Sequence, residues 1–306
     1  MEVKDSFIFT SSNQDYSFIC YEFEGKKIKP KFYKEKIDEL SLYPENVPGR
    51  APYFPFGIAK NEKFIYVISH TNLAHFDAET YEYLGLIKEC KTGVNSHQMI
   101  IDEDNPDLLY ICNTSNDSLT IFNLKTKENK YVLLKDSIDK PFEIVDTIDF
   151  KFDVYIDDNY HINSICQHKD SLFLVLSFKE KAPSKILEIS KKDYQPLSII
   201  ENIGQFNHDI IVTDEYIYSL STKTGELVEY NRNDKTITKY NVCMDNDYWW
   251  LRGMKRINDS IYVFIGENWK TTIKIPMIVV KEFDMNSKKM LSTNLIALKA
   301  SCYQII

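Results

Sequence analysis

The chain has 306 residues, of which 43% are hydrophobic and 13% are aromatic, including 20 Tyr and 18 Phe. This supply of apolar and aromatic side chains is enough for a large core and favours strands over helices. A net charge of −8 without any basic stripe argues against nucleic-acid binding.

The N-terminal residues lead directly into a strand-like segment, without the basic and apolar regions of a secretory signal. No apolar stretch approaches the roughly 18 residues that a membrane-spanning helix needs. We therefore expect a cytoplasmic protein without membrane contact. The six cysteines include no C-x-x-C pair and are predicted to be reduced and structural.

Short strand-like segments follow one another along the chain, separated by polar turns. The first three read DSFIFTSS, DYSFICYEFE and KKIKPKFYK, and the best helical pattern of the chain follows them at 34–42. Apolar segments after a polar turn then recur at 63–70, 108–114, 171–178 and 260–266. The clearest unit, 207–240, contains four strands, NHDIIV, YIYSLS, ELVEYN and TITKY. A recurrence of roughly 45 residues is typical of propeller blades.

The two ends of the chain complement each other. The N-terminal segments supply three strands of a blade and lack its inner strand, whereas the C-terminal CYQII supplies one strand alone. We therefore predict an all-β fold, a six-bladed β-propeller that forms a single domain over 1–306. It closes by pairing the C-terminal strand with the N-terminal blade, which leaves no exposed edge there. A β-sandwich or two smaller barrels is the alternative, and it does not explain the recurring unit.

Three long loop insertions, at about 34–55, 135–159 and 242–250, are expected on one face of the propeller. The inner strand of each blade begins at this same face. Three of the six histidines, His97, His161 and His208, fall near the starts of three consecutive inner strands.

Three converging imidazoles are suited to hold a divalent transition metal such as Mn, Fe, Zn or Ni. Gln98, Asn163 or Asp209 would complete the ligand set. The alternative is that each histidine hydrogen-bonds neighbouring inner strands, and the register of the side chains decides between the two.

Arg252 follows two tryptophans, Trp249 and Trp250. A guanidinium fork beside an aromatic wall suits the binding of a carboxylate or phosphate. The alternative is an ion pair with one of three nearby acids, Asp245, Asp247 or Glu267. Arg50 is a second candidate for the same role. The acidic loop 135–159 lacks the spacing of an EF-hand, and the sequence contains no nucleophile elbow or nucleotide-binding glycine motif.

The segments HQMIID, HINSI and HDIIV, within about 95–231, resemble six-bladed propellers of the NHL and gluconolactonase type and a set of bacterial propellers. This resemblance implies the fold more than an activity. Lactonase relatives hold calcium with a Glu, two Asn and an Asp. Asn163 and Asp209 stand near comparable positions, whereas His97 and His208 depart from that pattern and no Glu matches.

Propeller-type pectate-fragment lyases look like a better parallel. They place three His and a Gln around manganese, and the matching residues here are His97, Gln98, His161 and His208.

The sequence thus predicts a metal-assisted enzyme of lyase or hydrolase type that acts on a small anionic or sugar-like molecule. The predicted metal ligands are His97, His161 and His208, and the predicted catalytic residues are His161, Tyr160 and Asp209. The predicted substrate-binding residues are Arg252, Trp249, Trp250, Asn163, Gln98 and Arg50.

The alternative function is a non-catalytic propeller that binds a protein or peptide partner through the same face. It predicts diverging histidines and an exposed aromatic patch, made of Tyr53, Phe54, Phe56, Trp249 and Trp250.

Overall fold

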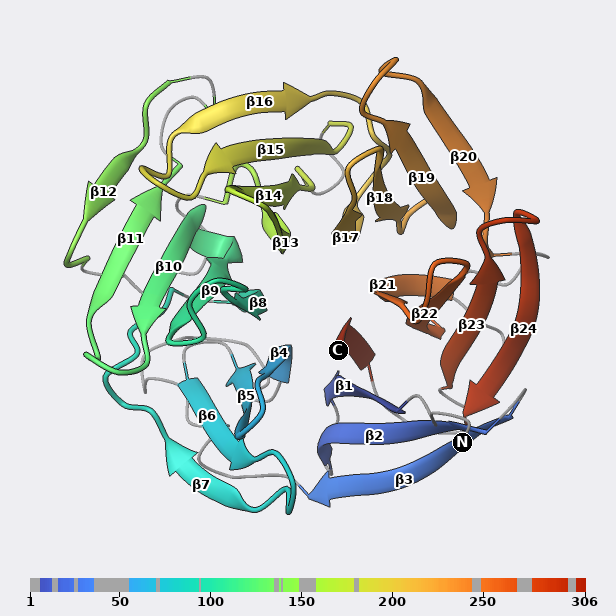
Figure 1. Ribbon diagram of the computed structural model, residues 1–306, viewed down its shortest axis with the longest axis horizontal. Helices are drawn as coiled ribbons and strands as arrows, with labels where there is room; N and C mark the ends of the chain where they lie inside the picture. The colour runs from blue at the N-terminus through green and yellow to red at the C-terminus, as the bar shows by residue number, and fades with distance from the viewer. Residues whose placement is uncertain are drawn as a thin grey trace.

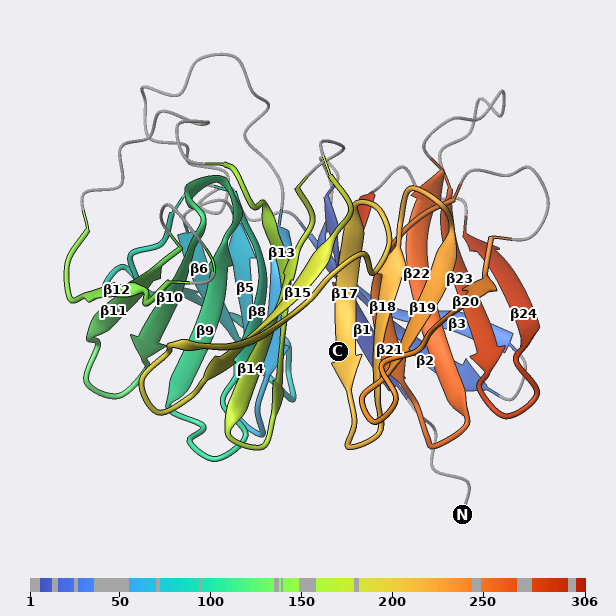
Figure 2. The same cartoon turned by 90° about the horizontal axis from the view of Figure 1, so that it is seen from above.

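The computed structural model describes residues 6–12, 16–24, 27–35, 55–69, 72–93, 95–134, 138, 140–148, 158–178, 182–243, 249–268, 277–296 and 301–306. Within these residues the fold is all-β, and the sheets are arranged around a central axis as a β-propeller (Figure 1). The all-β fold and the propeller arrangement predicted from the sequence are confirmed. Figure 2 shows the same sheets side-on, with their strands running between the two faces of the molecule.

The described strands form six antiparallel sheets. From the axis outward, the first sheet contains β25 (Ser301–Ile305), β1 (Ser6–Ser12), β2 (Tyr16–Glu24) and β3 (Lys27–Glu35). The second contains β4 (Pro55–Lys60), β5 (Phe64–Ser69), β6 (Asn72–Asp77) and β7 (Tyr83–Leu86). The third contains β8 (Ser96–Ile101), β9 (Leu108–Asn113), β10 (Ser118–Asn123), β11 (Asn129–Leu133) and β12 (Glu143–Val145). The 3-10 helix η2 (Thr114–Asn116) joins β9 to β10.

The other three sheets have four strands each. They are β13 (Ile162–His168), β14 (Ser171–Leu176), β15 (Lys185–Ser190) and β16 (Pro196–Ile200); β17 (Asn207–Val212), β18 (Tyr216–Ser221), β19 (Glu226–Asn231) and β20 (Ile237–Asn241); and β21 (Trp249–Arg256), β22 (Ile261–Asn268), β23 (Ile278–Asp284) and β24 (Lys289–Ile296).

The first sheet joins the two ends of the chain. Strand β25 pairs antiparallel with β1, and the backbone amides of Ile8 and Ile306 each donate to the other's carbonyl, at 3.0 and 2.9 Å. The predicted pairing of the C-terminal strand with the N-terminal segment is therefore confirmed. It leaves the inner side of β1 without an open edge.

The core lies between neighbouring sheets. The second strands β5, β9, β14 and β18 share one burial pattern, in which every residue after the first is buried. Such strands are covered on both faces, which explains why their sequences are almost continuously apolar. One hydrophobic cluster joins the β8–β12 sheet to the β13–β16 sheet, and another joins the β17–β20 sheet to the β21–β24 sheet. Burial falls toward the outer strands, as β16 and β20 show.

Three predicted boundaries differ from the structure. The helix expected at 34–42 is wrong at its start, because Lys34 and Glu35 pair with β2 as part of β3, while 36–42 lie outside the described residues. The insertion expected at 135–159 contains β12, a short strand in which Val145 pairs with Tyr131 and extends that sheet to five strands. The insertion at 242–250 ends earlier than expected, since β21 begins at Trp249.

Among the described residues, no helix has the length and apolar character needed to cross a membrane. The described cysteines Cys90, Cys112, Cys166 and Cys243 are free thiols, in agreement with the reduced state expected for them.

Candidate functional site

Each inner strand carries a β-bulge near its start. In β4, β13 and β21 the ladder shifts between Pro55 and Gly57, Ile162 and Ser164, and Leu251 and Gly253, and equivalent shifts occur in β8, β17 and β25. At every bulge two residues of the inner strand face one residue of the second strand. Bulges re-aim side chains, so each inner strand can present two consecutive residues toward the axis.

The first residues of five of these six pairs are Phe56, His97, Asn163, His208 and Arg252, all of which were singled out from the sequence. The second residues are Gly57, Gln98, Ser164, Asp209, Gly253 and Gln304, which we call the inner belt. Around the axis the inner belt alternates between a small residue and a larger polar one, which is Gln304, Gln98 or Asp209.

The long residues of the inner belt span their small neighbours. Gln304 accepts from the Ile58 amide at 2.8 Å and donates to the Met99 carbonyl at 2.9 Å, so it passes over Gly57. A Cβ on Gly57 would lie 3.1 Å from both the His97 oxygen and the Met99 nitrogen, which explains the glycine.

Gln98 continues the same pattern, and Asp209 bonds to the next inner strand. Gln98 accepts from the Ile165 amide at 2.6 Å and donates to Asp209 at 3.0 Å. Asp209 also accepts from the amides of Ile210, at 2.8 Å, and Met254, at 2.6 Å. Burial raises the pKa of Asp209 to about 6. Both side chains are thus engaged in joining inner strands, an arrangement that favours structural roles over the catalytic and substrate-binding roles predicted for them.

His97 has a defined tautomer. Its Nδ1 lies 3.1 Å from Asn163 Oδ1, and the amide nitrogen of Asn163 donates to the Asn207 carbonyl at 2.9 Å. Because that bond fixes which end of the Asn163 amide is oxygen, His97 Nδ1 must carry the proton and Nε2 is an acceptor. Asn163 is buried and orients His97.

His208 is held in the same tautomer. Its Nδ1 lies 3.0 Å from the Phe206 carbonyl and 2.9 Å from Thr222 Oγ1, and the Thr222 hydroxyl donates to the Leu251 carbonyl at 2.6 Å. Both partners of Nδ1 therefore accept, so this nitrogen is the donor. Burial lowers the pKa of His208 well below its usual value, and the nearby Arg252 charge lowers it further, which keeps the imidazole neutral near pH 7.

His161 forms a buried pair with Asp158. The His161 Nδ1 and Asp158 Oδ1 atoms are 2.8 Å apart, and the two side chains are 8% and 2% exposed. A carboxylate at Nδ1 holds the proton on that nitrogen and leaves Nε2 as the acceptor. Sequence analysis did not single out this role of Asp158.

The backbone around His161 is shaped by Asp117, which lies directly after η2. The Asp117 carboxylate accepts from the amides of Tyr160 and His161, at 3.0 and 2.9 Å, and from the amide of Asn159. His161 has a left-handed φ of 53°, a conformation that costs about 1–3 kcal/mol for a non-glycine residue. Burial raises the pKa of Asp117 to about 7.

Aromatic rings connect the three imidazoles. The ring centroids of Phe56 and His97 are 4.7 Å apart, and those of His97 and His161 are 5.6 Å apart at an interplanar angle of 88°. Phe206, which the sequence analysis missed, stacks on His161 at 5.9 Å and contacts His208 at 5.1 Å. We call these rings, together with Trp250 and Arg252, the mouth cluster.

The three predicted metal ligands thus lie in one neighbourhood, and the Phe206 ring contacts two of them. No group of three or more His, Cys, Asp or Glu side chains suited to hold a metal ion occurs among the described residues. The metal predicted from the sequence therefore stays a prediction.

Arg252 forms an ion pair with Glu267, whose Oε1 lies 3.0 Å from Arg252 Nη1. This is one of the pairings considered from the sequence. The guanidinium also lies 6.0 Å from the Trp250 ring centroid, and Trp250 contacts Phe206 at 5.3 Å. Because Glu267 compensates the Arg252 charge, the pair is a weaker anion site than a lone arginine.

Tyr160, one of the predicted catalytic residues, packs against Phe178 at 5.7 Å, beside the hydrophobic cluster between two sheets. Arg50, Tyr53, Phe54 and the Trp249 side chain lie outside the described residues. Phe56 is only 4% exposed, so it does not contribute to the exposed aromatic patch of the binding alternative.

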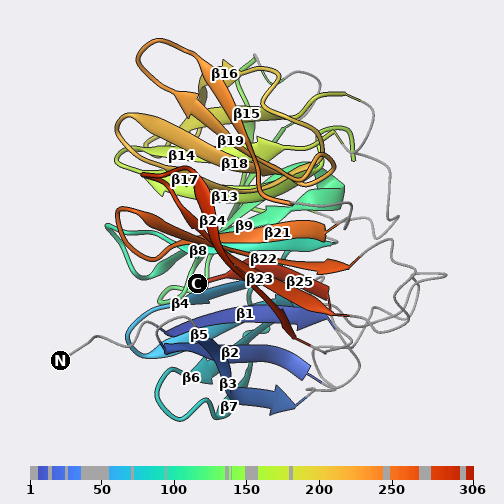
Figure 3. The ribbon, with the colours of Figure 1, turned by 90° about the vertical axis from the view of Figure 1, so that its right-hand side faces the viewer.

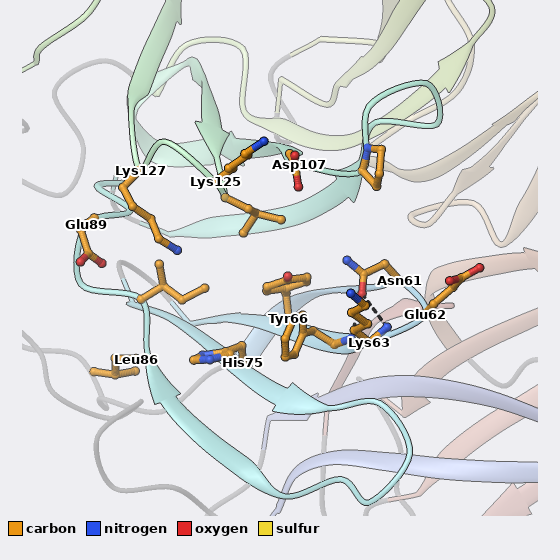
Figure 4. A pocket seen from close by; sticks show the side chains of 14 residues that line it. Asn61, Glu62, Lys63, Tyr66, His75, Leu86, Glu89, Asp107, Lys125 and Lys127 are labelled. Carbon is orange, nitrogen blue, oxygen red and sulfur yellow. Dashed lines mark hydrogen bonds between the residues drawn. The ribbon is translucent and has the colours of Figure 1, made fainter.

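A separate groove of about 880 Å³ lies between the β4–β7 and β8–β12 sheets, away from the mouth cluster (Figure 4). Tyr66 and His75 lie in it, and the Gly85 carbonyl lies 3.0 Å from His75 Nδ1. Its charged residues are three lysines and three acids, Lys63, Lys125, Lys127, Glu62, Glu89 and Asp107. The balance of charges indicates no particular ligand.

No protein-family model matches this sequence. No curated protein matches it significantly. Solved structures are similar in fold. A chain from a nidogen/laminin complex aligns with a TM-score of 0.65 and 11% identity over 98% of this chain and 97% of its own.

Two bacterial structures align similarly. A Bacteroides caccae protein of unknown function has a TM-score of 0.60 and 10% identity over 99% and 98% of the two chains. A Bacteroides uniformis protein provisionally described as a 6-phosphogluconolactonase has a TM-score of 0.53 and 13% identity over 96% and 83%. At these identities the likeness extends to the propeller fold and not to activity.

Proposed function

We propose that this chain is an enzyme of hydrolase or lyase type that acts on a small sugar-like molecule at the mouth cluster, with His161 as the proton acceptor. We further propose that the six sheets are the six blades of one closed domain over 1–306, which holds the residues of the mouth cluster in fixed positions.

The buried pair of His161 and Asp158 carries this proposal. A carboxylate bound to Nδ1 orients the imidazole, leaves Nε2 ready to accept a proton, and stabilises the imidazolium that forms. Two further features support the assignment. The left-handed φ of His161 is backbone strain of the kind that gathers at functional sites, and three amides donating to Asp117 hold it in place.

The balance of charge favours a sugar-like substrate over an anionic one. Asp158, Asp117 and Glu267 surround the mouth cluster, and Arg252 is the one basic side chain described there, already paired with Glu267. The fixed tautomers of His97 and His208 present Nε2 as an acceptor, which suits hydroxyl donors. Aromatic rings such as Phe206 offer apolar faces to a sugar ring.

The proposed proton transfer runs through His161 and not through a metal. Metal dependence stays a separate prediction. Elemental analysis of the purified protein beside His161→Ala tests it, because a metal bound at the three imidazoles would be lost from the variant.

The experiment is a turnover screen with matched variants. Turnover of neutral lactones is followed by acid release, and turnover of neutral glycosides and oligosaccharides by the appearance of reducing sugar. Uronate oligosaccharides, the sugar acids used for comparison, are followed by the absorbance of an unsaturated product. His161→Asn and Asp158→Asn are compared with His168→Asn, since His168 pairs with Asp214 at 2.9 Å on an exposed surface away from the mouth cluster.

We expect His161→Asn to lower kcat by about 10²–10⁴-fold, the usual contribution of a general base, while His168→Asn keeps wild-type activity. Equal activity in all three variants would refute the assignment of His161. Turnover of sugar acids in preference to neutral sugars would refute the proposed substrate class.

A further inference from the structure

The outer edge strands of the six sheets differ in how well they resist pairing with another chain. Four of them carry a known form of protection: β3 contains four lysines and Pro30, β7 and β12 have four and three residues, and β16 begins with Pro196. Strand β20 has five residues with a lysine at its centre. Strand β24 has eight residues, and its one charged residue, Lys289, is the first.

Strand β24 presents apolar side chains to solvent. It is the last strand of its sheet among the described residues, and it lies on the outside of the molecule in Figure 3. Its exposure alternates along its whole length, and Leu291 and Leu295 on the exposed face are 53% and 52% accessible. An uncharged edge strand of this kind is suited to pair with a further strand.

The sequence of β24 is chemically symmetric about Thr293. Residues at equal distances on either side of it are Ser292 and Asn294, Leu291 and Leu295, and Met290 and Ile296. The inner pair is polar and the two outer pairs are apolar. An antiparallel copy of β24, related by a two-fold axis at Thr293, would therefore place like chemistry opposite like chemistry at every position from Met290 to Ile296.

We propose that the partner of β24 is a second copy of this chain, with the two strands paired antiparallel about Thr293. Leu291 then packs against the partner's Leu295, and the partner's Leu291 against Leu295, which forms a small apolar interface on the exposed face. A two-fold dimer of this kind uses the same patch on both copies and closes upon itself.

The local geometry limits the length of the pairing. The ladder between β23 and β24 shifts at Leu291, because Ser292 faces Glu282 and Met290 faces Phe283. Such a bulge increases the twist of an edge strand, so we expect the paired region to run from Leu291 to Leu295 and the dimer to be weak.

The experiment measures mass by sedimentation over about 1–300 µM, a range in which small interfaces associate. We expect a monomer–dimer equilibrium in the wild type. The double variant Leu291→Lys with Leu295→Lys should be monomeric, as should Leu291→Glu with Leu295→Glu, because each places like charges opposite each other. An equimolar mixture of the two should dimerise again. The matched control Leu197→Lys changes a residue that is 58% exposed on β16, and it should leave the equilibrium unchanged.

Register is tested separately with Thr293→Cys, which should form a symmetric disulfide dimer under mild oxidation, while Leu197→Cys should not. A wild type that stays monomeric over the whole range, or a dimer that the lysine double variant does not weaken, would overturn the proposal. Circular dichroism of each variant establishes that it is folded, which is expected for exposed positions.

Discussion

Replacing Gln98 by glutamate converts one hydrogen bond of the inner belt into a contact between two acids. In the wild type Gln98 donates to Asp209 across 3.0 Å at a buried position. Gln98→Glu keeps the oxygen that accepts from the Ile165 amide but brings a second carboxyl against Asp209. Two carboxylates this close cannot both ionise near neutral pH, so the folded variant must retain a shared proton.

The shared proton determines how the free energy of unfolding of the variant changes with pH. The pair has a folded pKa raised above the unfolded values of about 3.9 and 4.3, so its stability contribution is full at acidic pH and is lost as pH rises. At about 1.4 kcal/mol per pH unit, the variant should lose about 4 kcal/mol between pH 5 and pH 8. The wild type should lose about 1.4 kcal/mol, because Asp209 alone titrates at about 6. The difference between them is about 3 kcal/mol.

The assay is urea unfolding at pH 5, 7 and 8. Gln167→Glu is a matched control, since Gln167 also accepts from a backbone amide, at 2.9 Å, and donates to a carboxylate, Asp104, at 3.2 Å. There the carboxylate is 73% exposed and bound to Lys191, so no added pH dependence is expected. If Gln98→Glu parallels the wild type from pH 5 to pH 8, the inner belt does not join Gln98 to Asp209 as described.

Two further predictions concern the supports of the site. Because the pKa of Asp117 is raised to about 7, lowering the pH through 7 should protonate this carboxylate and shift the NMR resonances of the Asn159 and His161 amides that donate to it. Asp117→Asn should abolish the shift, and resonances that do not move in the wild type would contradict the burial of this carboxyl. Gly57→Ala should destabilise the fold by about 1–3 kcal/mol, because the new Cβ would lie 2.7 Å from an Ile68 methyl; an unchanged urea midpoint would show that the close approach is relieved at little cost.

The elements of this fold were largely predictable from local patterns. The strands β17, β18 and β19 match the predicted segments NHDIIV, YIYSLS and ELVEYN at both ends. The pairing of the chain ends was predictable because the N-terminal unit lacked an inner strand and the C-terminal strand belonged to no complete unit. The short β12 was missed because only Ile144 and Val145 distinguish it from the surrounding acidic loop.

The site was harder to predict because bulges change the register. In β8 and β17 two consecutive residues face one residue of the neighbouring strand. His97 therefore belongs to the mouth cluster and Gln98 to the inner belt, although they are adjacent in sequence. Asp117 was missed because it belongs to another sheet and acts through backbone amides 42–44 residues away. Its role depends on tertiary contacts that no local pattern reports.

The alternation within the inner belt requires the ring to contain an even number of sheets. Because Gln304 passes over Gly57, Gln98 passes over Ser164, and Asp209 accepts from the amide that follows Gly253, the repeating unit is two sheets rather than one. A circle with an odd number of such sheets would have to place two long or two small residues side by side. Duplication or design can therefore enlarge this architecture without disturbing the belt only by adding sheets in pairs, such as the neighbours that contribute Ser164 and Asp209.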